Sequence, residues 1–381
     1  MKKILTFLLI CFAHVVHAES RPKICLNMIV KNEEPVIERC LASVKPYIDY
    51  WVIVDTGSTD NTMEKIRNFL KDVPGELHEC PWQNFEFNRN QALDLARSKG
   101  DYVMFIDADE QLIFEKDFSF PKDFNKDGYL MTVRDNEIEF LRMLLVSTKK
   151  NWFWKGVMHE TIMCQEQHEV DVMRNMYNLA IADGARSRDP KKYEKDAQVL
   201  EKALVFEPNN SRYMFYLGQS YLNCGQYENA LKAYQRRSTM GGWDQEVYWS
   251  LYCIGRIQEI LKAPEEQIML SYARAFEYRP TRAEPLSRMA DILIKKGAPR
   301  MALILLSQAK QIPMPCEGVF VEKNVYNYTM DLQIADALYL TGNKAKAREI
   351  FSHMSSLDTV PETVKSAIVK HINEVIDKPQ Q

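Results

Sequence analysis

The stretch DYVMFIDADE, residues 101–110, decides which fold the sequence predicts. Its apolar part, residues 102–106, has the length of a strand and is rich in β-branched and aromatic side chains, which is typical of a parallel strand buried on both faces. Asp107, Asp109 and Glu110 follow directly. Ligands bind at the carboxyl ends of strands in an open α/β sheet, so these carboxylates predict a site for a divalent cation, or for a cation and a ribose. A solvated acidic turn is the alternative.

The residues before this stretch alternate between strand and helix patterns. We expect strands at residues 23–30, 51–54 and 77–80, and helices at residues 35–44, 63–70 and 87–98. With short connections and right-handed crossovers, this order predicts an α/β fold in which helices flank a doubly wound, mostly parallel sheet. Beyond residue 110 the pattern is weaker, and further strands are expected at residues 128–133 and 139–146.

Three strand ends are expected to meet at one edge of this sheet. Asn32 and Glu33 follow the first strand, Asp55 follows the second, and Asp107 follows the strand at residues 102–106. A nucleotide would lie at such an edge. The sequence contains neither GxGxxG nor GxxxxGK[ST], which excludes a Rossmann dinucleotide site and a P-loop.

The chain is long enough for two domains and has no large excess of either charge. Of its 381 residues, 46% are hydrophobic and 27% are charged, and the formal net charge is −3. An ordinary globular core is therefore expected. The charge balance argues against nucleic acid, or an anionic membrane, as the main partner.

The first 18 residues have the pattern of a secretory signal peptide. Lys2 and Lys3 precede an apolar run at residues 4–13, and the small-residue cleavage pattern VHA ends at Ala18. This predicts the secretory pathway or export, with tethering to a membrane by an uncleaved N-terminus as the alternative. Besides Cys11 in this segment, the seven other cysteines are scattered and lack CxxC spacing. Zinc and a dense disulfide framework are not indicated, whereas one or two disulfides are left open.

From residue 190 to about 375 the sequence favours helices and contains a repeat. Gly225, Ala230 and Tyr234 are five and four residues apart, and the same spacings recur at residues 297, 302 and 306 and at residues 342, 347 and 351. This is the tetratricopeptide pattern, with glycine at the turn and small residues where paired helices cross. Such repeats stack into a solenoid that often binds a peptide or protein. A helical cap that only stabilises the first domain is the alternative.

The aromatic segment NWFWKGVMHE, residues 151–160, ends in a second group of polar side chains. His159 beside Glu160 could supply a further metal ligand, or could be a partly buried histidine at a strand end. Trp152 and Trp154 could stack on a sugar or belong to the core. Arg186, near the end of the first domain, could close over a diphosphate or pair with a surface carboxylate.

Taken in order, these motifs resemble family 2 glycosyltransferases of the GT-A fold. The resemblance lies in residues 25–62, with KNEE and DTGSTDNT, in residues 87–93, in FIDADE at residues 105–110, which resembles the DxD motif, and in GVMHE at residues 156–160. It implies a GT-A domain at residues 22–185, followed by the tetratricopeptide-like domain at residues 190–375, a combination that a bacterial-type subset of the family shares.

The resemblance also implies roles for individual residues. The expected donor-binding residues are Asn32, Glu33, Asp55, Arg89, Asp107 and Arg186. The expected ligands of Mn²⁺ or Mg²⁺ are Asp107, Asp109 and His159. An inverting transfer needs a carboxylate as general base, and the candidates are Glu160, then Glu110 and Asp135.

The sequence therefore predicts a metal-dependent, inverting glycosyltransferase. It would move a hexosyl or N-acetylhexosaminyl group from a nucleotide-sugar donor, expected to be UDP-linked, to a glycan, lipid or protein acceptor. The alternative is a tetratricopeptide protein-binding scaffold whose transferase-like domain is inactive. A nucleotidyltransferase is not favoured, because no Gly-rich loop with Lys or Arg follows the first strand.

Overall fold

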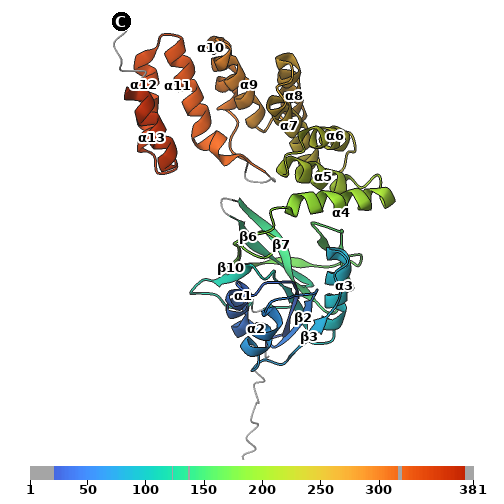
Figure 1. Cartoon of the computed structure of the whole chain (residues 1–381). Coiled ribbons are helices and arrows are strands. Elements are labelled where there is room, and N and C mark those ends of the chain that lie inside the picture. Colours follow the sequence, from blue (N-terminus) through green and yellow to red (C-terminus); the bar gives the residue numbers. More distant parts are fainter. Residues whose placement is uncertain (1–20, 122, 136–137, 316–319, 374–381) are drawn as a thin grey trace, which may run out of the picture. The chain divides into compact units, whose positions relative to one another are not determined.

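In the computed structural model the chain divides after Pro190 into two compact units (Figure 1), which are described separately below. The structure describes residues 21–121, 123–135, 138–315 and 320–373. The predicted signal segment, residues 1–18, lies outside these ranges.

The first unit is a mixed α/β domain. Its strands are β1 (Ile24–Val30), β2 (Tyr50–Asp55), β3 (Gly75–Glu79), β4 (Tyr102–Phe105), β5 (Glu110–Phe114), β6 (Gly128–Asp135), β7 (Ile138–Ser147), β8 (Trp152–Lys155), β9 (Thr161–Cys164) and β10 (Val170–Ala180). Its helices are α1 (Ile37–Val44), the short 3-10 helix η1 (Lys45–Tyr47), α2 (Thr62–Phe69) and α3 (Phe85–Ala96).

The main sheet has the strand order β3-β2-β1-β4-β7-β6-β10-β5. Its first half, β3 to β4, is parallel throughout. In the second half, β7 runs antiparallel to both β4 and β6, and β10 runs parallel to β6 but antiparallel to β5. The predicted α/β fold with a mostly parallel sheet is confirmed. A separate pair, β8 and β9, lies outside this sheet.

The parallel strands form because their sequences are almost continuously apolar. All four residues of β4 are buried, and β1 and β2 are buried along nearly their whole length, as expected for strands covered on both faces. Helix α3 packs on β1, β2 and β8, and α1 packs on β5 and α2. Asn84 caps α3 by accepting a hydrogen bond from the amide of Phe87 at 2.9 Å, so this helix begins two residues before the predicted start.

The register of the parallel strands brings their carboxyl ends to one edge. Val30 at the end of β1 lies opposite Asp55 at the end of β2. On the other side of β1, Asn27 lies opposite Phe105, the last residue of β4. The polar segments that follow these three strands therefore leave the sheet at the same edge, which is where the sequence predicts the site.

The second unit is helical. Its elements are α4 (Lys192–Phe206), α5 (Ser211–Asn223), α6 (Tyr227–Ser238), α7 (Asp244–Ile260), α8 (Glu265–Tyr278), α9 (Glu284–Lys295), α10 (Pro299–Ala309), the π-helical turn η2 (Val325–Thr329), α11 (Met330–Leu340), α12 (Lys344–Ser356) and α13 (Glu362–His371). Consecutive helices pack on one another as hairpins, as Figure 1 shows.

The repeat pattern of the sequence has a clear structural role in this unit. Gly225, Gly297 and Gly342 end the first helix of three hairpins with positive φ angles of 77°, 75° and 91°, a conformation that glycine adopts without strain. The alanines five residues later, Ala230, Ala302 and Ala347, are fully buried. The predicted tetratricopeptide-like architecture is therefore confirmed.

Two further observations concern the cysteines and the membrane. The cysteines that the structure describes, Cys25, Cys40, Cys80, Cys164, Cys224 and Cys253, are free thiols. None of the helices within the described ranges has both the length and the apolar character needed to cross a membrane.

Candidate functional site

The loops after β1 and β2 are tied together by hydrogen bonds. Asn32 has a left-handed backbone (φ 57°), which asparagine tolerates better than most residues. Its side-chain oxygen accepts from the amide of Thr59 at 2.7 Å, and its own amide donates to the hydroxyl of Ser58 at 2.9 Å. The amide of Glu33 donates to Thr62 Oγ1 at 2.8 Å. The KNEE and DTGSTDNT segments thus form one polar wall at the edge of the sheet.

Asp55 lies at the base of this wall, and only one of its two carboxylate oxygens accepts hydrogen bonds from the loop. Its side chain is almost fully buried, and Oδ1 accepts from the amides of Gly57 at 2.9 Å and Ser58 at 2.7 Å. Within the part of the chain that the structure describes, Oδ2 has no hydrogen-bond partner. A buried carboxylate oxygen without a partner is costly, so this atom is suited to accept a hydrogen bond from a ligand.

Arg89 from α3 joins two predicted site residues. Its Nη2 donates to Asp107 Oδ1 at 2.7 Å, and its Nε donates to Glu160 Oε1 at 2.5 Å. The guanidinium also lies over the ring of Trp154, 5.0 Å from the ring centre. Arg89 is about nine-tenths buried, so one cation holds the carboxylates of the DADE and GVMHE motifs at fixed positions.

Glu110 makes a second charged contact behind Asp107. Both of its carboxylate oxygens accept from Arg142 Nη2, at 2.6 and 2.7 Å, and Oε2 also accepts from the amide of Asp107. Burial opposes ionisation of Asp107, but Arg89 and Arg142 outweigh it, and the pKa of Asp107 is lowered. Burial raises the pKa of Glu110, against the opposing effect of Arg142. Glu110 therefore lies behind Asp107, and the guanidinium of Arg142 fixes its position.

The segment that follows β10 covers the other side of the site. The amide of Gly184 donates to Asp109 Oδ2 at 3.2 Å, and the amide of Ala185 donates to Glu33 Oε2 at 3.0 Å. A Cβ atom on Gly184 would lie 2.8 Å from Asp109 Oδ2, so only glycine allows this approach. Arg39 holds the segment in place through two hydrogen bonds to Asp183, at 2.7 and 2.6 Å.

The two carboxylates under this segment are shifted towards protonation. Burial raises the pKa of Glu33 to about 7, and the nearby charge of Asp109 adds to the effect. Burial also raises the pKa of Asp109, and the negative charge of Asp107 contributes further. Ionised together, these carboxylates repel one another, which is the electrostatic setting that a bound cation relieves.

The remaining predicted residues lie around this centre. Arg186 lies over the ring of Phe85 at 5.2 Å, with Nη2 3.8 Å from the sulfur of Met158. His159 has a left-handed backbone (φ 51°) and an exposed side chain. Asp135 ends β6, opposite Ala180 of β10. The neighbouring residues 136–137 lie outside the described residues.

The predicted metal ligands do not form a complete protein site in this structure. Among the described residues, no three His, Cys, Asp or Glu side chains form a group that could hold a metal ion by themselves. Asp107 and Asp109 follow β4 at the sheet edge, but His159 is not grouped with them. The assignment of all three as ligands stays a prediction.

Sequence reasoning left open or missed some residues at this site. Trp152 and Trp154 are 2% and 6% exposed and belong to the core, so the core alternative holds for both. Arg39 and Arg142 were missed. Arg142 lies in β7 within the run FLRMLLV, residues 140–146, which is otherwise apolar, and a lone arginine in such a run was a usable signal that it faces a buried partner.

Comparisons with known proteins give a match in each of the two units. The family model described as "Glycosyl transferase family 2" matches residues 25–170, and the model "Tetratricopeptide repeat" matches residues 199–232. Within these ranges the chain is thus similar to family 2 glycosyltransferases and then to tetratricopeptide repeats.

Curated relatives match parts of the chain. It is 26% identical over 224 residues to the SPbeta prophage-derived glycosyltransferase SunS of Bacillus subtilis, which covers 52% of this chain and 49% of that protein. It is 38% identical over 94 residues to a TPR repeat-containing protein of Synechococcus elongatus, covering 24% of this chain and 22% of that protein. An uncharacterized glycosyltransferase of Rickettsia typhi is 34% identical over 90 residues, covering 24% of this chain and 29% of its own. The matches thus span about half or less of these relatives.

Solved structures give weaker similarities. The crystal structure of MamA protein has 13% sequence identity and a TM-score of 0.34, covering 50% of this chain and 88% of that chain. A tetratricopeptide repeat protein from Parabacteroides merdae has 15% identity and a TM-score of 0.37, covering 50% of this chain and 75% of that chain. Similarities of this size carry no argument about function.

Proposed function

We propose that the first unit transfers a sugar from a nucleotide-sugar donor, UDP-linked in the first instance, to an acceptor hydroxyl with inversion. The observation that carries the proposal is the convergence of Glu33, Asp55, Asp107 and Asp109 with Arg89 at the carboxyl ends of β1, β2 and β4, in a domain of glycosyl transferase family 2. Nucleotides bind at this edge in open α/β sheets.

The donor would be recognised by groups of two kinds. Asp55 Oδ2, buried and without a partner among the described atoms, would accept a hydrogen bond from an N–H of the base or a hydroxyl of the ribose. Arg186 lies beside Phe85 and Met158, from where its guanidinium would pair with the diphosphate. These assignments extend the predicted roles of both residues.

The carboxylates fit a hard divalent cation. Asp107 and Asp109 offer oxygen ligands, and the pKa of Asp109 is raised by burial and by its neighbour Asp107, which a cation would reverse. Two carboxylates, completed by substrate phosphates and water, are a usual set for Mg²⁺, and Mn²⁺ accepts the same oxygens. When bound, the ion would stabilise the charge that develops on the leaving nucleotide.

Glu160 is the best-placed general base. Arg89 Nε holds its Oε1 at 2.5 Å while Arg89 Nη2 holds Asp107 at 2.7 Å, so the carboxylate is fixed beside the donor residues. We assign its Oε2 to the proton of the acceptor hydroxyl. Glu110 is less suited, since Arg142 engages both of its oxygens. Asp135 remains a candidate.

The experiment is isothermal titration of the full chain with UDP, with and without Mn²⁺, followed by UDP-sugar hydrolysis. We expect Mn²⁺ to tighten UDP binding at least tenfold, which is about 1.4 kcal/mol. Asp109→Asn should remove this increment and abolish hydrolysis. The control is Asp94→Asn, because Asp94 is an exposed carboxylate of α3 that pairs with Arg97, and it should behave like the wild type.

Each outcome bears on the proposal. Mn²⁺-dependent binding that Asp109→Asn abolishes, and that Asp94→Asn retains, supports a donor site with its metal at the carboxylates. Unchanged hydrolysis in Asp109→Asn contradicts the role of Asp109. If UDP, GDP and the other nucleotides all fail to bind, the first unit is an inactive domain, and the alternative of a protein-binding scaffold takes its place.

A further inference from the structure

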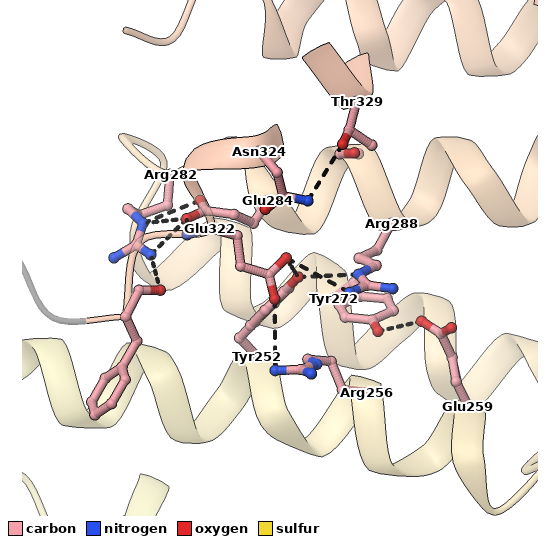
Figure 2. Close-up of polar contacts among 12 residues, drawn as sticks. Tyr252, Arg256, Glu259, Tyr272, Arg282, Glu284, Arg288, Glu322, Asn324 and Thr329 are labelled. Atoms are coloured by element: carbon pink, nitrogen blue, oxygen red, sulfur yellow. Dashed lines mark hydrogen bonds and ion pairs between the residues drawn. The ribbon is translucent and has the colours of Figure 1, made fainter. Parts of the chain in front are cut away.

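A short segment between α10 and α11 packs against three helices of the second unit. It comprises residues 320–324, directly before η2, and its side chains contact α5, α7 and α9. Figure 2 shows Glu322 of this segment among Tyr252, Arg256 and Arg288. These contacts belong to the second unit alone and are independent of the proposed sugar transfer.

The aromatic side chain of the segment stacks on two rings of the helical array. Phe320 lies 5.0 Å from the ring of Trp249, nearly parallel to it at 24°, and 5.7 Å from the ring of Phe215. Trp249 belongs to α7 and Phe215 to α5. The ring of Phe320 therefore contacts the first helix of the hairpin α5–α6 and the first helix of the next hairpin, α7–α8. Such pairs add to the free energy of apolar burial.

Two residues later, a carboxylate meets a phenol and two guanidinium groups. Glu322 Oε2 accepts from the hydroxyl of Tyr252 at 3.0 Å. Arg256 Nη1 and Arg288 Nη2 each lie 3.6 Å from a carboxylate oxygen of Glu322. Two other acidic side chains nearby already have partners: Glu259 accepts from Tyr272, and Glu284 pairs with Arg282. One carboxylate thus faces two cations.

The main chain of the segment is also held by side chains. Arg282 Nη2 donates to the carbonyl oxygen of Phe320 at 3.1 Å. The amide of Glu322 donates to Glu284 Oε1 at 3.4 Å, and Arg282 and Glu284 form a buried ion pair at 2.6 Å. Donor and acceptor side chains that bind a main chain on both sides of one residue are a way to recognise an extended peptide.

We infer that the aromatic–arginine surface, defined as Phe215, Trp249, Tyr252, Arg256 and Arg288, is a peptide-binding site that the chain's own segment occupies. Its external ligand is a peptide with an aromatic residue two positions before a carboxylate, the spacing of Phe320 and Glu322. Charge complementarity argues for this partner, because two guanidinium groups face a single internal carboxylate.

Three features fit a replaceable occupant better than a permanent part of the core. Phe320 has a positive φ of 60°, a strained conformation for an aromatic residue. The two ion pairs of Glu322 are loose at 3.6 Å, and the arginine side chains are 35% and 37% exposed. Buried Arg282 Nη1 has no hydrogen-bond partner among the described atoms. An unstrained external peptide could therefore make better contacts.

The test uses the full chain and a fluorescent peptide with the sequence of residues 317–325, EGVFVEKNV, followed by fluorescence anisotropy. In the wild type the tethered segment competes at an effective concentration on the order of millimolar. We expect the emptied variant, Phe320→Ala with Glu322→Ala, to bind the peptide at least tenfold more tightly than the wild type. The control Asn324→Ala should bind like the wild type, because Asn324 is exposed and donates to Thr329.

Further variants separate recognition from nonspecific binding. In the emptied variant, Arg288→Ala should weaken binding at least tenfold, and so should replacing the peptide glutamate by glutamine. Binding that is indifferent to the peptide carboxylate would overturn the inference. So would an emptied variant that shows the circular dichroism spectrum of the wild type yet binds no peptide, because the segment would then be a structural plug.

A milder variant keeps the inference testable if the emptied one does not fold. Glu322→Gln removes the charge and keeps the stacked ring, so the peptide should displace the segment more readily than in the wild type. The readout is hydrogen exchange of residues 320–324, which should become faster when peptide is added in excess. Exchange that stays unchanged at saturating peptide would contradict the inference.

Discussion

Arg89 is the single residue that connects most of the candidate site. One guanidinium contacts Asp107 and Glu160 through different nitrogens and lies over the ring of Trp154. A lysine could not make this arrangement, because its ammonium group is a compact point charge without a planar fork. The residues of two motifs, 53 positions apart in the sequence, thus reach one place through a buried cation from a third segment.

The raised pKa of Glu33 gives the stability of the chain a predicted pH dependence. The pKa is about 7 in the folded chain, against an ordinary value of 4.5. Folding therefore takes up a proton between these values, and ionisation of Glu33 costs stability increasingly from pH 4.5 to 7 and constantly above. We expect Glu33→Gln to raise Tm relative to the wild type at pH 8, and to leave it unchanged at pH 4.5. Differential scanning calorimetry in EDTA measures both.

The neighbouring glutamate is the control for this effect. Glu34 is in the same loop, but hydrogen bonds from Asn61 lower its pKa, so Glu34→Gln should bring no gain at pH 8. A Tm difference for Glu33→Gln that is the same at both pH values would show that the substitution acts by some other route than removal of a buried charge.

At the scale of elements, the segment after β10 is the part of the site that depends most on long-range contacts. It places the amides of Gly184 and Ala185 on Asp109 and Glu33, and the Arg39–Asp183 pair connects it to α1. The side chains of this pair are 32% and 42% exposed, so the pair should add at most about 1 kcal/mol to global stability. Its effect should be local.

We therefore expect Arg39→Met to accelerate amide hydrogen exchange in residues 181–188 at least tenfold while Tm changes little. The reason is that the segment loses the two hydrogen bonds that fix it to α1. Exchange measured by mass spectrometry gives the answer. Arg21→Met is the matched control, because Arg21 makes a similar two-bonded pair with Asp49 at comparable exposure. Unchanged exchange in residues 181–188 would show that other contacts hold the segment.

The elements that the sequence predicts well are those with strong local patterns. The strand predicted at residues 102–106 is β4, which ends at Phe105. The predicted helices and strands before it are observed with shifts of one or two residues at most ends. Strands β5, β9 and β10 were not predicted. Strand β10 mixes polar and apolar residues irregularly and shifts register against β6, so its place in the sheet is set by pairing partners that are distant in the sequence.

The candidate site shows the same difference between features set by local patterns, which were predicted, and features set by long-range contacts, which were not. The residues that follow β1, β2 and β4 could be placed at one edge, because strand order alone brings parallel strand ends together. The contacts of Arg142 with Glu110 and of Arg39 with Asp183 could not be predicted, since each joins segments that no local pattern relates. For the same reason, Glu110 was a candidate base from the sequence alone, because the sequence does not show that Arg142 engages both of its oxygens.

At the scale of the whole molecule, each unit has hydrophobic clusters of its own. The cluster of the first unit includes Ile53, and one of the clusters of the second unit includes Leu306; both side chains are fully buried. Replacing either by alanine should cost about 2–5 kcal/mol, because a cavity is left in a packed core. The position of the loss along the chain then tells whether the two units unfold separately.

We expect Leu306→Ala to accelerate hydrogen exchange in α9, α10 and α11, which pack around this side chain and its cluster, and to leave β1, β2 and β4 protected. Helical repeats are stabilised mainly by their neighbours, so the effect should fade towards α5. Ile53→Ala should give the reverse result, with fast exchange confined to the sheet. If either substitution exposed both units to the same degree, the chain would unfold as one cooperative body, and the separate cores would not be separately stable.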